Sequence, residues 1–407
     1  MTNLSVLNIN GYESPGRRFN GISIAELLLS HGVNSSHLVW EKDTNDEMVL
    51  TFEGKNTRRV NEFIRRVEDR LSLQSVLYPN ARKIMKMPAF ENADLLHLHI
   101  IHSGYLSLGD LPALTKAKPT VWTLHDPWAM TGHCVYPISC NRWLKECGQC
   151  PDLEAHFPLR FDTTNFLFNY KRKAYKKSNM DLIVASSWME DMVARSPMFE
   201  HARVHKLPFG VDLNFFSEKA VTNARVRFGI PDETLVICFR AVNNSFKGLP
   251  FIIEALRRIK STKPICLLTF NTAGLLEEFR DKFQIVELGW TNDEQLTRDA
   301  FVASDIFLMP STAEAFGVMA IEALACSKPV IVFEGTALPE VVFSPDVGIA
   351  VPMRDGISLC EALQRLIDNP EERSLRGKLG RKIAEKYYGQ DLYAARLTEV
   401  YKMVAQS

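Results

Sequence analysis

Short apolar runs alternate with amphipathic stretches along the whole chain, an alternation typical of βα units that build parallel sheets. We expect the apolar runs to be buried strands. In the first half they lie at 4–9, 95–101, 120–124 and 182–185. In the second half they lie at 236–240, 266–270, 285–288, 306–309 and 330–333. Helical spacing occurs at 250–259, 318–325 and 392–404, and capping boxes that start helices are predicted at 187–190 and 291–294.

The segment 206–216, KLPFGVDLNFF, has the Pro and Gly of a connection and divides the chain near its midpoint. We therefore predict an α/β chain of two Rossmann-like, doubly wound domains, at 1–205 and 206–385. The stretch 386–407 is predicted to be a helix that packs back on the first domain. Ligands of open α/β sheets bind beyond the carboxyl ends of the strands, so we expect the two domains to face a central cleft.

Composition removes several classes of function. The 407 residues hold 48 Lys and Arg against 48 Asp and Glu, so no net charge draws the chain to a nucleic acid. Any anionic ligand must then be held by locally placed groups. No 18 apolar residues run together, and the start, MTNLSVLNIN, lacks the basic and apolar regions of a secretory signal. We expect a cytoplasmic protein with no nucleic-acid partner.

The segment 311–329, STAEAFGVMAIEALACSKP, follows the predicted strand 306–309 and carries the most chemistry. Glu314 stands in the loop, and Glu322 lies about two helical turns further on. The residues that lead into the helix, whose free N–H groups can hold a phosphate, are Ala315, Phe316, Gly317 and Val318. Carboxylates accept hydrogen bonds from hydroxyls, and backbone amides hold phosphates. The two kinds of group side by side therefore suit a ligand that is a polyol diphosphate. An ordinary amphipathic helix with two surface glutamates is the alternative.

The spacing of Glu314 and Glu322 resembles the E-x7-E signature of the retaining GT-B glycosyltransferases of family 4, and the similarity covers nearly the whole chain. Other matching motifs are GVD at 210–212, KG at 247–248, KPV at 328–330, LPEVV at 338–342 and the strand at 348–352. The segment from HDPW at 125–128 to CGQCP at 147–151 is similar to the colanic acid and related exopolysaccharide glycosyltransferases of that family. This resemblance implies a GT-B fold and transfer of a hexose with retention of configuration.

The resemblance also implies roles for single residues. Arg240 and Lys247 would hold the diphosphate of a nucleotide-sugar donor. Glu314 would bind the sugar hydroxyls and Glu322 the ribose. The physical reading agrees, because two cations near strand and helix ends would stabilise the diphosphate as a leaving group. The Arg240 to Lys247 spacing is longer than is usual in the family.

Three further contacts with the donor follow from the same resemblance. His125, directly after the predicted strand 120–124, would contact the donor sugar. Gly289 and Trp290 would lie by the nucleotide base. The glycine pair that the family places after its first strand is reduced here to Gly16 and Gly21, and either could approach the donor phosphates. Of the histidines at the end of another strand, His97, His99 and His102, one could contact an acceptor and the others belong to the core.

Four of the eight cysteines fall within a short segment, at Cys134, Cys140, Cys147 and Cys150. In a reducing compartment such a group favours a structural zinc over disulfides, and unliganded thiols are the other alternative. His133 could replace one ligand. In each case the expected role is to shape the loop beside His125. We expect no catalytic metal, because the sequence contains no D-x-D pair to hold a cation on the diphosphate.

Basic residues gather on predicted helices of the first half, at 58–59, 65–66, 70, 82–83, 171–173 and 176–177, the last two sets amid aromatic residues. Such faces could rest on an anionic lipid surface, where a polyprenyl-diphosphate-linked acceptor would be embedded; solvated helix faces are the alternative. We therefore expect a retaining transferase that moves a hexose from a UDP- or GDP-sugar to a glycan or lipid-linked acceptor of surface polysaccharide synthesis, with peripheral contact to the membrane. A GT-B nucleotide-sugar epimerase and a catalytically silent glycan- or nucleotide-binding protein are the other two hypotheses.

Overall fold

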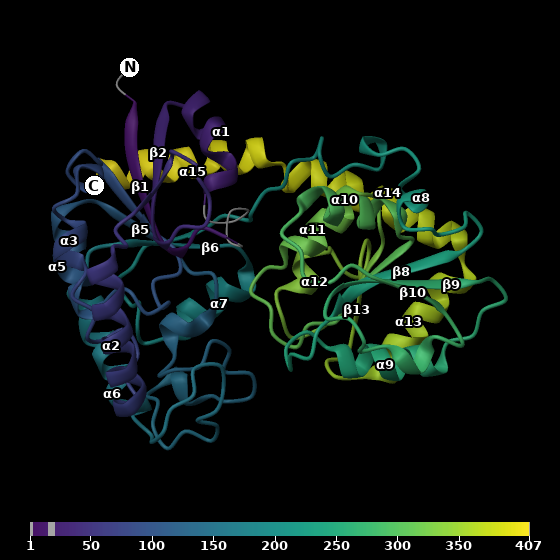
Figure 1. Cartoon of the computed structure of the whole chain (residues 1–407), viewed down its shortest axis with the longest axis horizontal. Helices are drawn as coiled ribbons and strands as arrows, with labels where there is room; N and C mark the ends of the chain where they lie inside the picture. The colour runs from purple at the N-terminus through teal and green to yellow at the C-terminus, as the bar shows by residue number, and fades with distance from the viewer. Residues whose placement is uncertain (1–2, 15–20, 407) are drawn as a thin grey trace. The chain divides into compact units, whose positions relative to one another are not determined.

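The computed structural model describes residues 3–14 and 21–406, and the chain forms two compact units. The first unit runs to Leu207 and takes up the chain again from Tyr393, and the second unit spans Pro208–Leu392. The division after Leu207 lies close to the boundary predicted at 205/206, whereas the return to the first unit comes later than the predicted 385/386. The two units are described separately below (Figure 1).

The first unit is built on a seven-stranded parallel sheet of order β3-β2-β1-β4-β5-β6-β7. Its strands are β1 (Leu4–Tyr12), β2 (Val33–Glu41), β3 (Val49–Thr51), β4 (Leu95–Leu98), β5 (Thr120–Thr123), β6 (Asp181–Val184) and β7 (Val204–Lys206). Its helices are α1 (Ala25–Ser30), α2 (Lys55–Leu71), α3 (Ala81–Ile84), α4 (Pro88–Glu91), α5 (Leu111–Ala117), α6 (Thr164–Lys176), α7 (Ser187–Arg195) and α15 (Gln390–Ala405). The central strands β4 and β5 are buried along their whole length, as expected of a parallel sheet covered on both faces.

The second unit is built on a six-stranded parallel sheet of order β10-β9-β8-β11-β12-β13. Its strands are β8 (Leu235–Ala241), β9 (Ile265–Asn271), β10 (Gln284–Glu287), β11 (Ile306–Met309), β12 (Val330–Phe333) and β13 (Ile349–Val351). Its helices are α8 (Ala224–Arg227), α9 (Leu249–Arg258), α10 (Glu294–Ala303), α11 (Val318–Ala325), α12 (Leu338–Val341), α13 (Gly356–Asp368) and α14 (Pro370–Tyr387). Figure 1 shows α9 and α13 on one face of this sheet and α10, α11 and α14 on the other.

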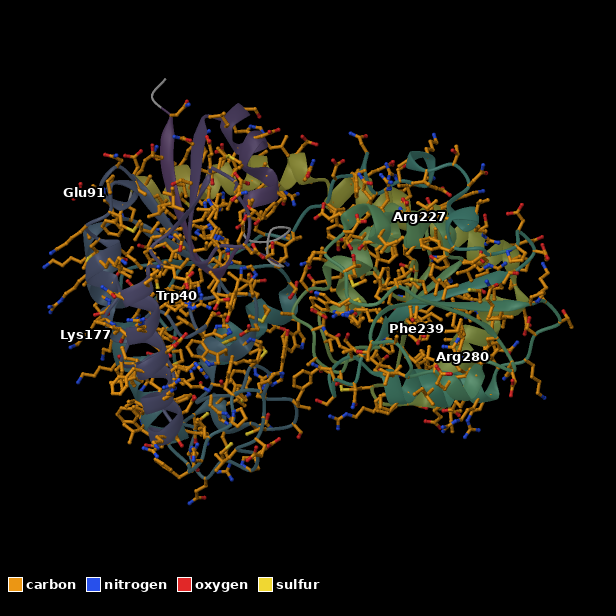
Figure 2. All side chains as sticks on the ribbon, viewed as in Figure 1. Trp40, Glu91, Lys177, Arg227, Phe239 and Arg280 are labelled. Atoms are coloured by element: carbon orange, nitrogen blue, oxygen red, sulfur yellow. The ribbon has the colours of Figure 1, made fainter. Side chains whose placement is uncertain are left out.

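Alternate residues of β8 show why this sheet is covered on both faces. Ile237 and Phe239 belong to one apolar cluster with the inner sides of α9 and α13. Cys238, between them, is also fully buried, so the opposite face is covered as well. In Figure 2, Phe239 lies among the side chains that fill the unit. The predicted α/β class with two Rossmann-like, doubly wound domains is confirmed.

The strands β2, β3 and β7 were not predicted, and β13 was expected only from the matching motif at 348–352 and not as an apolar run. The long strand β2 escapes the pattern because Asn34, Ser35, Ser36 and His37 interrupt it. Ser35 and His37 are nevertheless buried, since they hydrogen-bond within the unit. The strands β3, β7 and β13 have three residues each, which is too short for periodicity to register.

Both predicted capping boxes are shifted along the chain. The N-cap of α7 is Ser186, whose hydroxyl accepts from the Met189 amide, and not Ser187. The N-cap of α10 is Asp293, whose carboxylate accepts from the amides of Gln295 and Leu296, and not Thr291. In each helix another capping residue close in sequence competes for the first free amides, and motif matching alone does not choose between them.

No helix within residues 3–14 and 21–406 combines the length and the apolar character needed to cross a membrane.

Candidate functional site

The site in the second unit lies where the strand order reverses, between β8 and β11. In open α/β sheets this switch point leaves a crevice at the carboxyl ends of the strands. Two hydrogen bonds join the loops that follow the two strands. The Thr312 amide donates to the Phe246 carbonyl at 2.9 Å, and the Thr312 hydroxyl donates to the Ser245 carbonyl at 3.1 Å. The loops are therefore one assembly rather than two independent segments.

Gly248 lets these loops approach each other. Its φ is +72°, in the left-handed region, and it precedes the first residue of α9. A Cβ at this position would stand 2.0 Å from the Pro310 carbonyl oxygen. Only glycine fits both the backbone angle and the close contact.

Lys247 and Glu314 form an ion pair across the joined loops. The Lys247 Nζ lies 2.9 Å from the Glu314 Oε2, a normal distance for a charge-assisted hydrogen bond. The two side chains are 23% and 16% exposed, so both are still within reach of a ligand. The structure thus brings together the predicted diphosphate-binding cation and the predicted sugar-binding carboxylate.

Arg240 lies near the end of β8, beside this pair. Its Nε donates to the Asn271 Oδ1 at 2.9 Å. Burial lowers the pKa of the guanidinium, while the nearby Glu314 carboxylate raises it. The sequence reasoning did not find Asn271. Asn271 could have been found, because it is a polar residue at the carboxyl end of a predicted strand, the same position that His125 has.

The start of α11 is a second place where an anion could bind. Gly317 is its N-cap, with φ +101°, and a Cβ there would stand 2.4 Å from the Leu338 Cδ2. Gly317 has no side chain with which to cap the first amides of this helix. These amides, with the positive end of the helix dipole, suit a phosphate oxygen, and the Val318 amide is among them.

The other residues of this motif that were predicted to bind the donor have buried side chains. The side chains of Ala315 and Phe316 are buried, and the Phe316 ring packs against Phe209 and Tyr388 with centroids 5.3 and 5.9 Å away. Only the backbone of these two residues is placed to meet a ligand. Glu322 is fully buried in α11, so its predicted contact with a ribose stays a prediction.

Gly289 and Trp290 follow β10 at the same edge of the sheet. The Asn271 amide donates to the Gly289 carbonyl at 2.8 Å, which places this loop beside the Arg240 and Asn271 contact. Trp290 is 65% exposed, and such a ring is available for stacking on a base.

The first unit carries the predicted His125 after β5. Its Nε2 lies 3.1 Å from the His99 Nδ1, and the His99 Nε2 lies 3.1 Å from the Asn8 Oδ1. Burial lowers the pKa of His125 to about 3 and that of His99 well below its ordinary value. Both rings are therefore neutral at physiological pH. His97 instead meets the hydroxyls of Tyr401 and Thr123, both at 2.7 Å, and belongs to the core.

Space next to His125 is small. A cavity of about 10 Å³ is lined by residues that include His99, His102, His125 and Asp126. That volume has room for about one water molecule and none for a sugar ring. The His102 Nε2 lies 3.6 Å from the Asp126 Oδ2, and the His102 ring stacks on Trp128 at 4.6 Å.

Of the two predicted glycines in the first loop, Gly16 lies outside the described residues. Gly21 has φ +91°, and a Cβ there would stand 3.3 Å from the Asn8 Oδ1. Gly21 itself therefore lies close to Asn8, one of the polar residues beneath His125.

The Cys-rich loop does not form a metal centre as the structure places it. All eight cysteines are free, and within the described residues no three His, Cys, Asp or Glu side chains are grouped to hold a metal ion. Burial raises the pKa of Cys134 to about 11 and that of Cys147 to about 12, and it also raises that of Cys150. The shortest contact of His133 with these thiols is 3.4 Å, from its Nε2 to the Cys150 Sγ. The structure supplies no four-ligand zinc geometry, so the zinc hypothesis stays a prediction.

A buried cation anchors this loop instead. Lys171, on α6, donates from Nζ to the carbonyls of Trp128 at 2.7 Å and Thr131 at 3.0 Å. Its Nζ also lies 3.3 Å from the centre of the Trp128 ring. The sequence assigned Lys171 to a basic surface, and this is wrong because the side chain points inward, where burial lowers its pKa to about 7.

A pocket of about 700 Å³ lies at the opposite edge of the first sheet from His125, before β6 and β7. Its lining includes Arg172, Lys173 and Lys176 from the end of α6 and the apolar Tyr175 and Phe199. Cations in the last turn of a helix are common because they offset its dipole, so this pocket is not by itself a ligand site.

Comparison with known proteins fits this geometry. Residues 233–369 match the family model described as "Glycosyl transferases group 1", and this span includes Arg240, Lys247, Glu314 and Glu322. A mannosyltransferase of Corynebacterium glutamicum, named as GDP-mannose-dependent and acting on a monoacylated phosphatidylinositol monomannoside, is 30% identical over 50% of this chain and 56% of its own. The putative colanic acid biosynthesis glycosyl transferase WcaC of Escherichia coli is 23% identical over 61% of this chain and 62% of its own. The chain thus spans about six tenths of the length of these curated relatives.

Solved structures resemble the chain over its full length. A sucrose-phosphate synthase of Thermosynechococcus elongatus matches all of both chains with a TM-score of 0.72 at 18% identity. HepE of Anabaena, solved in complex with UDP-glucose, matches 98% of this chain and all of its own with a TM-score of 0.66 at 13% identity. At these identities the likeness concerns the fold, and the predicted GT-B fold class is confirmed.

Proposed function

We propose that the chain is a glycosyltransferase that moves a hexose from a nucleotide-sugar donor to a glycan acceptor; the match of residues 233–369 to the glycosyl transferases group 1 supports this. The observation that carries this proposal is the ion pair of Lys247 and Glu314 at the switch point of the second sheet. In this pair a cation suited to phosphate is in contact with a carboxylate suited to hydroxyls. A nucleotide sugar needs both groups, the cation for its diphosphate and the carboxylate for its hexose.

The donor diphosphate would bind to Lys247, Arg240 and the free amides at the start of α11. Glu314 would then exchange the Lys247 ammonium for hydroxyls of the sugar. Both cations and amides stabilise the negative charge that develops on the diphosphate as it leaves. Because these groups already supply positive charge, we propose that no catalytic metal is needed.

In the transfer step, the bond from the sugar C1 to the phosphate oxygen breaks and a bond from C1 to the acceptor oxygen forms. The acceptor hydroxyl proton passes to the leaving phosphate, and a nucleoside diphosphate is released. We propose that the configuration at C1 is retained, on the strength of the resemblance to family 4.

The donor is proposed to be a UDP- or GDP-sugar. HepE binds UDP-glucose and the Corynebacterium relative is named for GDP-mannose, so the relatives support either base. Trp290, exposed beside Gly289, is proposed to meet that base.

We propose a lipid-linked glycan as the acceptor, as an intermediate of surface polysaccharide synthesis. WcaC is named for colanic acid biosynthesis, and the Corynebacterium relative is named for a lipid acceptor. In the first unit α2 exposes Val60 and Phe63 together with arginines at 58, 59, 65, 66 and 70. Lys177, at the end of α6, is exposed as well and lies at the outer edge of its unit in Figure 2. Such a mixture of apolar and basic side chains suits peripheral contact with an anionic membrane.

Release of nucleoside diphosphate tests the function directly. The wild-type chain is incubated with a panel of UDP- and GDP-sugars, with and without lipid-linked acceptor. We expect acceptor-dependent release, and about a hundredfold loss of turnover in Glu314→Gln, since a charge-assisted hydrogen bond to the substrate is lost. Glu361→Gln, on the exposed side of α13, is the matched control and should retain wild-type turnover.

Other outcomes separate the alternatives. Turnover of the sugar without acceptor and without net release of nucleoside diphosphate would identify an epimerase. Nucleotide binding without any turnover would identify a silent binding protein. Undiminished transfer by Glu314→Gln would refute the assignment of this site.

A further inference from the structure

Asn271, the last residue of β9, is a side-chain partner of Arg240. The two residues stand on adjacent strands, because β8 pairs with β9 so that Ala241 lies opposite Asn271 and Arg240 lies opposite Phe270. The Arg240 Nε lies 2.9 Å from the Asn271 Oδ1. A guanidinium nitrogen can only donate a hydrogen bond, so the end of the Asn271 amide that faces Arg240 must be its oxygen. One cation of the candidate site is therefore held by a neutral acceptor.

The backbone of Asn271 has a conformation that few residues adopt. Its φ is +81°, in the left-handed region, where Asn is tolerated better than most residues other than Gly. Neighbouring segments hold this conformation with two hydrogen bonds. The Asn271 amide donates to the Gly289 carbonyl at 2.8 Å, and the next amide, of Thr272, donates to the Ala241 carbonyl at 2.8 Å. Uncommon backbone angles held in this way are concentrated at functional sites, and the fixed backbone lets the Asn271 side chain serve as an anchor.

The contact with Asn271 uses the single N–H of the Arg240 Nε and leaves the N–H groups of both Nη atoms. These Nη atoms make no hydrogen bond with any residue in the described part of the chain. Arg240 is only partly buried, so a ligand can still reach its guanidinium. Because the guanidinium is planar, a hydrogen bond at Nε restricts its plane, and the two Nη groups can then meet two phosphate oxygens side by side.

We propose that Asn271 is a positioning residue, which holds the Nε of Arg240 so that both Nη groups are presented to the diphosphate of the donor. This inference rests on the proposed function, in which Arg240 binds that diphosphate, and it deepens that function by adding a residue that acts through Arg240. Fixing a long side chain in the free protein reduces the entropy that it would lose on binding. Lys247, which is paired with Glu314, would instead change its partner when a diphosphate binds.

The contact can be measured in the free protein. In a ¹H–¹⁵N spectrum of protein labelled with ¹⁵N-arginine, an Nε–H that donates to a fixed acceptor exchanges slowly with water. The Arg240 signal is identified by its absence in Arg240→Lys. We expect slow exchange in the wild-type chain and in Asn271→Asp, which keeps an acceptor oxygen, and fast exchange in Asn271→Gly, which has none. Fast exchange in the wild-type chain would overturn the proposal, whether or not any variant folds.

The variant Asn271→Gly deletes the amide and keeps the backbone, because glycine adopts a positive φ without strain. Asn223→Gly is the matched control. Asn223 also has a positive φ, +61°, in the same unit; it is exposed, and its side chain does not cap the helix α8 that follows it. This variant should match the wild-type chain in the exchange of the Arg240 Nε–H and in ligand binding. If Asn223→Gly also made that exchange fast, the effect would belong to the whole unit and the specific role of Asn271 would be refuted.

A double-mutant cycle separates positioning from direct contact with the ligand. The probe is UDP or GDP, whichever the wild-type chain binds, and titration calorimetry gives the Kd. We expect Asn271→Gly to raise this Kd roughly two- to tenfold, the range for ordering one long side chain on binding. In an Arg240→Ala background the same substitution should have no further effect, because the residue through which Asn271 acts is gone. An equal effect in both backgrounds would mean that Asn271 binds the ligand itself or only supports its loop, and it would refute the positioning role.

The outcomes also distinguish this inference from the proposed function. If the chain binds UDP or GDP but transfers no sugar, the proposed function fails and the cycle still decides the role of Asn271. If the chain transfers a sugar and Asn271→Gly binds the nucleotide as tightly as the wild type, only this inference fails. If neither nucleotide binds, both fail at the diphosphate, and slow exchange of the Arg240 Nε–H would show a contact of purely structural value.

Discussion

At the scale of single residues, the ligand-free chain already shows how the donor could bind. Lys247 and Glu314 neutralise each other at 2.9 Å, and both keep some exposure. A nucleotide sugar supplies a replacement for each partner, a phosphate for the ammonium and hydroxyls for the carboxylate, so neither group would lose its hydrogen bond on binding.

Lys247→Ala should weaken the binding of a nucleoside diphosphate by about 1.5–3 kcal/mol, roughly ten- to a hundredfold in Kd, because one charge-assisted hydrogen bond is lost. Titration calorimetry measures this directly. Lys378→Ala, an exposed lysine on α14, removes the same charge from the same unit and should leave the Kd within about twofold of wild type. If both variants bind alike, Lys247 does not hold the diphosphate.

Strand ends can be predicted from the sequence, and topology alone places the carboxyl ends of parallel strands at one edge of each sheet. His125 directly follows a predicted strand, Arg240 ends another, and Glu314 stands in the loop after a third. Their partners were harder to foresee. Asn8 lies within β1 and Lys171 on a basic stretch of α6, and only tertiary packing shows that the first contacts the His99 ring and the second is buried.

At the scale of elements, the loop between β8 and α9 contains a glycine that no larger residue could replace, because the loop after β11 lies too close to it. Gly248→Ala would combine the strain of a left-handed residue with a clash on the Pro310 carbonyl. Gly274→Ala has nearly the same φ, +79° against +72°, and meets nothing within 4 Å. The two substitutions therefore differ in the clash and share the backbone strain.

We expect Gly248→Ala to lower the free energy of unfolding by about 1–3 kcal/mol more than Gly274→Ala does, the usual cost of overpacking. It should also weaken nucleotide binding, because the displaced residue adjoins Lys247. Urea unfolding and titration calorimetry on both variants test the two parts. Equal losses would show that the contact with Pro310 relaxes freely.

The hydrophobic periodicity of the sequence predicted some helices and strands correctly and missed others. The strands β11 and β12 and the helix α11 have the predicted bounds, because the two strands are apolar throughout, the helix is apolar except for Glu322, and all three end in clear breaks. The strand β2 was missed because its buried Ser35 and His37 read as surface residues. The hydrogen bonds that stabilise these buried polar side chains come from several strands, so no short segment of the sequence contains all of the partners.

At the scale of the whole molecule, titratable groups are unevenly divided. All ten histidines precede residue 206 and so fall in the first unit, and the second unit has none. Desolvation lowers the pKa of His97 and His99 well below the ordinary value and that of His125 to about 3, with His102, His133 and His156 lowered as well. A group whose pKa is depressed by folding binds fewer protons in the folded state than in the unfolded state. The stability it contributes is present above its unfolded pKa of about 6.5 and is lost as the pH falls.

Acid should therefore weaken the first unit before the second. At pH 5.5, below the unfolded pKa, each strongly shifted histidine costs on the order of 1 kcal/mol, so His97, His99 and His125 together should weaken the first unit measurably. Most carboxylates titrate below this window, so the second unit should change little between pH 7.5 and 5.5.

Pulse proteolysis in urea, read by mass spectrometry of peptides from each unit, measures the stability of the two units at once. His125→Asn should reduce the loss in the first unit by on the order of 1 kcal/mol relative to wild type, whereas His201→Asn, at an exposed position, should leave it unchanged. Equal weakening of the two units would mean that these rings are already hydrated and able to charge in the folded protein.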